Sequence, residues 1–270
     1  LMLGIKPERQ RAMMEESLDA IIRLMSDPEP YTVKTDWFEM NDAVLQLRPY
    51  QDPIVPVAVA SVESPAGVTL AGKHGASILS LSVPRDTIRK TSLAELWSIA
   101  EETAAEHGKE MHREDWGVVM GMHLAETKEQ AMKDIRESSA NLVTEYFGET
   151  LGNPVPDVPR DQIVDYMVDH NQWIVGTPDD CIAGIERLQE ITGGFGKFMI
   201  RVEDWAPRDK IHRSYELLAR YVMPHFQGSL EGIRISRDWA SDRKEALQQN
   251  RYAGIKAATD RFDAGRSNGR

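Results

Sequence analysis

Residues 54–78 limit the folds open to this chain more than any other stretch. An apolar run, 54–60, leads into a short polar turn, 61–67, and then into a small-residue helical stretch that ends at Gly75. A second apolar run covers residues 76–83. Runs of Val, Ile and Ala like these predict parallel strands that are buried on both faces. The stretch therefore predicts one β-α-β unit.

The polar turn lies at the C-terminal end of the first predicted strand, where α/β sheets and barrels place their ligands. It offers a serine hydroxyl, a flexible glycine and the backbone amides that open the next helix, and these groups suit an anion. An ordinary strand–helix loop is the alternative. The residue types alone favour this alternative.

Further strands and helices repeat the pattern of the first unit. Two more apolar segments, 116–124 and 197–202, bring the predicted strands to four. Ser92 with Glu95 and Thr127 with Gln130 predict capping boxes, and Thr177 followed by Pro178 predicts another helix start. The remaining predicted helices span residues 92–107, 127–147, 161–171, 177–191 and 210–226. Four strand–helix units are half of an eight-stranded α/β barrel, so a small doubly wound sheet and the second half of a barrel both stay open.

Two segments precede these units, and a polar tail follows them. Residues 7–25 predict an amphipathic helix, and residues 31–47 predict a small hairpin. We expect one domain over residues 1–228 and a tail, 229–270, that is partly helical or disordered. The apolar stripe of the first helix is expected in the core and comprises Met14, Leu18, Ile21, Ile22 and Met25.

Composition and charge exclude several classes of function. With 43 acidic and 32 basic residues the net charge is −11, which makes nucleic acid a poor partner. The single cysteine, Cys181, allows no internal disulfide and fits a reducing compartment such as the cytoplasm. We expect the Cys181 thiol to be packed in the core as a structural residue. No apolar run approaches the length of a membrane span, and we expect neither a signal peptide nor a membrane partner.

The histidines give no sign of a metal site. The seven histidines do not cluster and no metal-binding spacing occurs, so no metal is expected. His123 ends a predicted strand, a position that can face the mouth of a barrel. A structural histidine whose hydrogen bonds are satisfied is the favoured alternative.

Three blocks, in this order, resemble the luciferase-like, flavin-dependent monooxygenases. They are PVAVASVESPAGVTLAGKHGASILSL (56–81), VGTPDDCIAGIERLQEITGGFGKFMI (175–200) and ELLARYVMPHF (216–226). The leading segment LGIKPERQRAMMEESLDAIIRLM, together with the SPAG turn, is most similar to the limonene and alkanal monooxygenase branch. The resemblance covers residues 3–228.

The resemblance implies a (β/α)8 barrel of the TIM type that binds reduced FMN at the C-terminal ends of its strands. This chain would supply the C-terminal four strand–helix units. A Glu-Ser pair after the fifth barrel strand, matched here by Glu63 and Ser64, would hold the flavin phosphate through the Glu63 amide and the Ser64 hydroxyl. Gly67 matches a hydroxyl position and offers only its amide, and Ala60 and Ser61 would lie near the isoalloxazine. In the family, the phosphate-binding arginine and the catalytic histidine belong to the four strands before the helix that matches residue 7 onward. The resemblance implies that these strands are missing here, so no catalytic residue is assigned.

The implied activity is that of an oxidoreductase, a monooxygenase that uses reduced FMN and O2 to oxygenate a small apolar substrate such as a terpene or aldehyde. A separate flavin reductase and a homo-oligomer are implied as partners, and a truncated chain that is inactive alone fits the count of strands. Two alternatives stay open. The same turn suits deazaflavin F420 in a hydride-transfer enzyme, and a non-catalytic half-barrel subunit would pair through its open sheet edges. The sequence does not identify the substrate.

Overall fold

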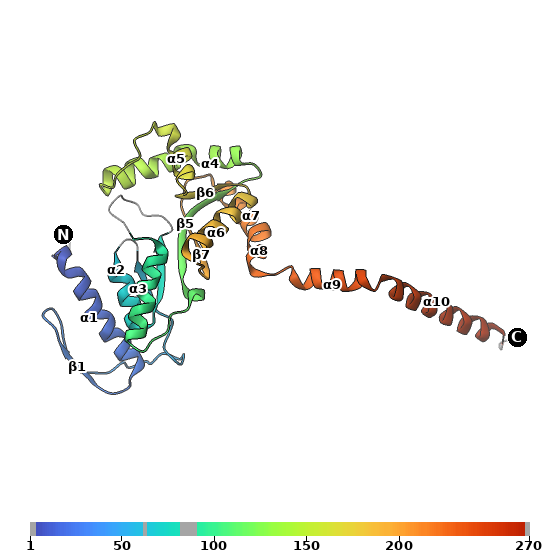
Figure 1. The fold of residues 1–270 in the computed structure, drawn as a ribbon, viewed down its shortest axis with the longest axis horizontal. Coiled ribbons are helices and arrows are strands. Elements are labelled where there is room, and N and C mark those ends of the chain that lie inside the picture. Colours follow the sequence, from blue (N-terminus) through green and yellow to red (C-terminus); the bar gives the residue numbers. More distant parts are fainter. Residues whose placement is uncertain (1–3, 62–63, 82–90, 268–270) are drawn as a thin grey trace. The chain divides into compact units, whose positions relative to one another are not determined.

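The computed structural model describes residues 4–61, 64–81 and 91–267 and shows an α/β chain (Figure 1). The chain divides into two compact units, Leu1–Arg213 and Ser214–Arg270. The first unit contains an open sheet in which all described strand pairs are parallel. Its strands are β3 (Ala58–Ser61), β4 (Ser77–Leu81), β5 (Gly117–Leu124), β6 (Trp173–Gly176) and β7 (Lys197–Arg201).

Strand β5 is the centre of this sheet because it is long enough to pair with three neighbours. Its first residues pair with β4. The stretch from Gly117 to Gly121 pairs with β7, and the stretch from Gly121 to Leu124 pairs with β6. The four predicted strands are confirmed as β3, β4, β5 and β7, although β3 begins at Ala58 and residues 82–83 lie outside the described residues. The predicted burial on both faces is wrong for β3 and β4, where every second residue is at least partly exposed, because α2 covers only one face of β3. Strand β6 was not predicted, because four apolar residues directly before a helix cap are too few to show a pattern.

The helices of the first unit begin where their capping residues predict. Ser92 and Glu95 form the predicted capping box, and Thr177 forms another with Asp180. The box at Thr127 is wrong in one half: Thr127 accepts from the Gln130 amide, but the Gln130 side chain donates to Asp134 instead. The helices named so far are α2 (Pro65–His74), α3 (Leu93–Glu106), α4 (Lys128–Asn141), α5 (Ile163–Asp169) and α6 (Pro178–Thr192).

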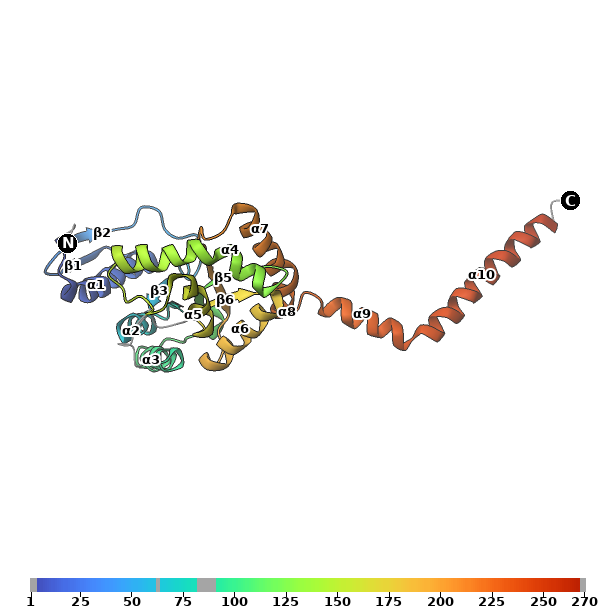
Figure 2. The same ribbon diagram turned by 90° about the horizontal axis from the view of Figure 1, so that it is seen from above.

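Helix α4 continues past its predicted end. The segment Leu142–Thr150 follows it with wider, π-type turns, so the helical path reaches beyond residue 147. Helix α4 packs with α5 and β6 around one apolar cluster (Figure 2). The buried members of this cluster are Ala125, Ala131, Met132, Ile135, Ala140, Val143, Ile163, Val164, Trp173, Val175, Trp205 and Ala206.

Helix α1 (Pro7–Ser26) is confirmed as a helix, but its apolar stripe is not in the core. Met14 is 40% exposed and Ile21 is 50% exposed, and only Ala20 is buried. The reason is that polar contacts dock this helix: Lys73 of α2 lies 3.0 Å from Glu15 and 2.9 Å from Asp19.

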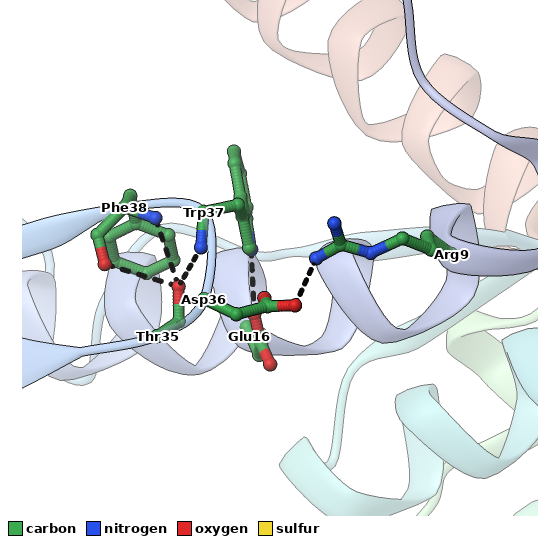
Figure 3. Close-up of polar contacts among 6 residues, drawn as sticks. All are labelled: Arg9, Glu16, Thr35, Asp36, Trp37 and Phe38. Carbon is green, nitrogen blue, oxygen red and sulfur yellow. Dashed lines mark hydrogen bonds and ion pairs between the residues drawn. The ribbon is translucent and has the colours of Figure 1, made fainter.

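The predicted hairpin is confirmed as β1 (Tyr31–Lys34) and β2 (Glu39–Ala43). Figure 3 shows how its turn is fastened to α1. The Trp37 indole donates to Glu16 at 2.6 Å, and Asp36 pairs with Arg9. Polar contacts therefore hold the hairpin as well as the helix.

The second unit is helical over its described residues. The predicted closing helix spans three segments, α7 (Arg208–Leu217), the π-type segment Leu218–Val222 and α8 (Met223–Gln227), and begins in the first unit. The polar tail then forms α9 (Glu231–Asp242) and α10 (Lys244–Ser267). The predicted domain boundary at residue 228 stays a prediction. None of the helices in the described part of the chain has the length and apolar character needed to cross a bilayer.

Candidate functional site

The polar turn after β3 leads from the strand end to the first turn of α2. Four of the five predicted site residues, Ala60, Ser61, Ser64 and Gly67, lie at this junction. Glu63 is outside the described residues, and its role stays a prediction. Since β3, β4 and β5 run parallel, the junction is at the C-terminal edge of the sheet.

The hydroxyl of Ser64 makes no capping hydrogen bond to the helix that it precedes. The residue occupies the N-cap position of α2 with extended backbone angles, φ −110° and ψ 149°. Ser92 and Thr177, at the same position of α3 and α6, both use their hydroxyls as caps. The half-buried Ser64 hydroxyl can therefore serve a ligand.

Within the described residues, the first helical turn of α2 carries no negative charge; Glu63, which precedes the N-cap, lies outside these residues. In contrast, Glu95 opens α3 and Asp179 opens α6. The partial positive charge of a helix N-terminus stabilises an anion there when no side chain neutralises it. The α2 terminus therefore keeps its preference for an external anion.

Gly67 is required by the close approach of α2 to the end of β3. A Cβ at this position would lie 3.0 Å from Ser61 Cβ and 3.1 Å from the Ala60 carbonyl oxygen. The Ser61 hydroxyl donates to the Ser64 carbonyl at 3.5 Å, a long bond that also links strand end and helix start. The role predicted for Gly67 is to offer its backbone amide to the phosphate. The close packing of α2 against β3 is a separate reason why this position is a glycine.

Ala60 and Ser61 point to opposite faces of the sheet, as successive strand residues must. Ala60 is exposed, whereas Ser61 is only 3% exposed and packs against α2. The predicted contact with the isoalloxazine therefore suits the Ala60 side chain. For Ser61, only the backbone could make this contact, and its role stays a prediction.

A second polar pair lies at the same edge of the sheet. His123, near the end of β5, is buried as expected, but its hydrogen bonds are not satisfied as expected. Its Nε2 has no hydrogen-bond partner within the described residues and lies 3.5 Å from Asp134 Oδ2 on α4. Asp134 is not among the residues predicted from the sequence, although a carboxylate between Ala131 and Ile135 on the apolar side of a helix is a visible signal.

Known proteins share sequence with this chain over most of its length. The family model described as luciferase-like monooxygenase matches residues 1–193. A 4-hydroxyprotoasukamycin monooxygenase from Streptomyces nodosus subsp. asukaensis is 42% identical over 248 residues, which are 90% of this chain and 66% of the relative. This chain belongs to the luciferase-like monooxygenase family.

Another member of the family extends the match into the tail. Limonene 1,2-monooxygenase from Rhodococcus erythropolis is 40% identical over an alignment that covers 98% of this chain and 67% of the relative. Because so little of the chain is left out, most of α9 and α10 lies within that alignment. The chain spans about two-thirds of the length of these curated relatives.

Solved structures confirm the fold class of this family member. The oxygenating constituent of 3,6-diketocamphane monooxygenase from Pseudomonas putida, in complex with FMN, superimposes with a TM-score of 0.63 at 21% identity over 83% of this chain and 66% of that one. An F420-dependent secondary alcohol dehydrogenase superimposes with a TM-score of 0.56 at 19% identity over 81% of this chain and 62% of that one. At this identity the likeness shows the fold alone: α/β, of the luciferase-like TIM-barrel type.

Proposed function

We propose that this chain is part of a flavin-dependent monooxygenase that uses reduced FMN and O2 to oxygenate a small apolar substrate, such as a terpene or aldehyde. Membership of the luciferase-like monooxygenase family is the observation that carries the proposal. The names of the two curated relatives support an oxygenated organic substrate, since both are monooxygenases and one acts on limonene.

The residues at the start of α2 fit a flavin phosphate. The Ser64 hydroxyl makes no capping bond, and the ten-residue helix behind it has no acid in its first turn. In this proposal Ser64 donates its hydroxyl to the phosphate, and the backbone amides of Glu63 and Gly67 add two further donors. Ala60, on the exposed sheet face, would contact the flavin ring, and Ser61 would keep the turn in place through its bond to the Ser64 carbonyl.

When bound, reduced FMN would supply the electrons that activate O2, so that one oxygen atom is transferred to the substrate. The part of this chain is to bind and orient the flavin at the strand ends and to limit the access of water. A separate flavin reductase, a homo-oligomeric assembly and a cytoplasmic location complete the proposal.

Titration of the full chain with oxidised FMN and with F420 tests the choice of cofactor. We expect saturable quenching of FMN fluorescence and weaker binding of F420. Tighter binding of F420 than of FMN would contradict the proposal and would favour a deazaflavin-dependent hydride transfer instead. Absence of binding by either cofactor would also contradict it.

A further inference from the structure

His123 and Asp134 form a buried polar contact between a strand and the helix that packs on it. The His123 side chain is 1% exposed and the Asp134 side chain is 9% exposed. Their closest atoms, Nε2 and Oδ2, are 3.5 Å apart, beyond an ordinary N–H···O bond. Gln130, also on α4, donates to the other carboxylate oxygen, Oδ1, at 2.5 Å, and this bond holds the orientation of the Asp134 carboxylate. The imidazole thus faces a carboxylate without a full hydrogen bond.

The surroundings of His123 favour a neutral ring. Burial lowers the pKa of His123; the Asp134 carboxylate on α4 raises it in part, and the Lys210 ammonium on α7 lowers it further, so that the pKa lies below its ordinary value. Strand β6 contributes no titratable side chain, and its Val175 lies in register with His123.

We propose that the buried His123 ring, whose Nε2 has no hydrogen-bond partner within the described residues, is an acid-sensitive latch between α4 and the end of β5. Protonation of His123 favours the release of α4, and the nearby Asp134 carboxylate opposes this release in part. While α4 is docked, the imidazole is shielded from water. Once α4 moves away, the ring is hydrated and takes up a proton with the ordinary histidine pKa of about 6.5. Acid therefore favours the open state over the docked one.

The direction of the pH dependence follows from this difference. Because the docked pKa is below the open pKa, the stabilisation from the latch is complete above about pH 6.5 and is lost as the pH falls through the docked pKa. A single proton can change the opening equilibrium by at most about tenfold per pH unit. The apolar cluster around α4 determines the equilibrium constant for opening at neutral pH, and protonation changes it from that value.

The position of α4 makes this motion consequential for ligands. Helix α4 packs beside β6 and the end of β5 (Figures 1 and 2), and the strand ends are the ligand-binding edge of this fold. Release of α4 would open that edge at low pH. The inference holds whether or not a flavin binds at Ser64.

Hydrogen–deuterium exchange of the full chain between pH 5 and pH 8, corrected for the chemical exchange rate, tests the latch. We expect the amides of α4 to exchange faster below about pH 6.5, by up to about tenfold per pH unit. His123→Gln should abolish this pH dependence, whereas His107→Gln, which changes an exposed histidine at the C-cap of α3, should leave it intact. Asp134→Asn removes the group that raises the pKa, so the onset should stay and the effect should extend to lower pH.

Two results would overturn the latch. One is exchange in α4 that does not depend on pH, or that depends on it equally in His123→Gln. The other is an NMR titration of the unmodified chain that finds the pKa of His123 at or above about 6.5. The titration needs no variant, so the proposal stays testable if His123→Gln does not fold.

Discussion

Gly72→Ala is expected to destabilise the chain by about 2 kcal/mol, because the new methyl group has no room between α2 and α3. An ideal Cβ at this position would lie 2.5 Å from the Ala100 carbonyl oxygen and 2.9 Å from Thr103 Cβ. The first of these atoms belongs to the backbone of a helix, so the clash can be relieved only by moving one helix away from the other. Chemical denaturation measures the loss.

The matched control is a glycine in open space. A Cβ on Gly254 in α10 would meet nothing within 4 Å, so Gly254→Ala should leave stability unchanged or raise it by up to about 1 kcal/mol. Equal stabilities of the Gly72→Ala and Gly254→Ala variants would show that α2 and α3 are not packed as closely as described. Since α2 carries the candidate site, the Gly72→Ala change should also weaken flavin binding.

Ser64→Ala is expected to raise the dissociation constant for FMN by about tenfold or more. A hydrogen bond to a charged group contributes about 1.5–3 kcal/mol, and about 1.4 kcal/mol corresponds to a factor of ten. Folding should be nearly unaffected, because the Ser64 side chain caps no amide of α2. Fluorescence titration gives the dissociation constant, and the melting curve gives the stability.

Ser98→Ala is the control for the loss of a serine hydroxyl. Ser98 is exposed on α3, where its hydroxyl donates to the Ala94 carbonyl of its own helix. This variant should bind FMN as the unmodified chain does. If both variants bind equally well, the phosphate is not at Ser64.

The sequence was sufficient to predict four of the five described strands of the parallel sheet, and the helix starts at Ser92, Thr127 and Thr177. Val, Ile and Ala runs mark the parallel strands, although one face of β3 is exposed. The Ser92 and Thr177 caps act through bonds to residues three positions away, so their signal is local. Strand β6 was not predicted, because its four residues form a strand only by pairing with the C-terminal part of β5. This pairing is a tertiary contact that the local sequence does not show. The exposure of Met14 and Ile21 was not predicted either. Helical periodicity shows which residues share one face of a helix, but it does not show whether another element covers that face.

The candidate site was predictable as a location, but not in its detail. The order of strand, polar turn and helix places Ser64 at the ligand edge from the sequence alone. That Ser64 makes no cap while Ser92 does, and that Ser61 faces α2, follow only from backbone geometry. The contact between His123 and Asp134 joins a strand and a helix, and no spacing in the sequence encodes the distance between them.

The most direct test of the phosphate site compares FMN with riboflavin, which lacks only the phosphate, on the full chain and on Ser64→Ala. We expect FMN to bind the unmodified chain at least about tenfold more tightly than riboflavin. In Ser64→Ala this advantage should shrink while riboflavin binding stays the same. Equal affinities for the two flavins in the unmodified chain would contradict a phosphate site at the start of α2.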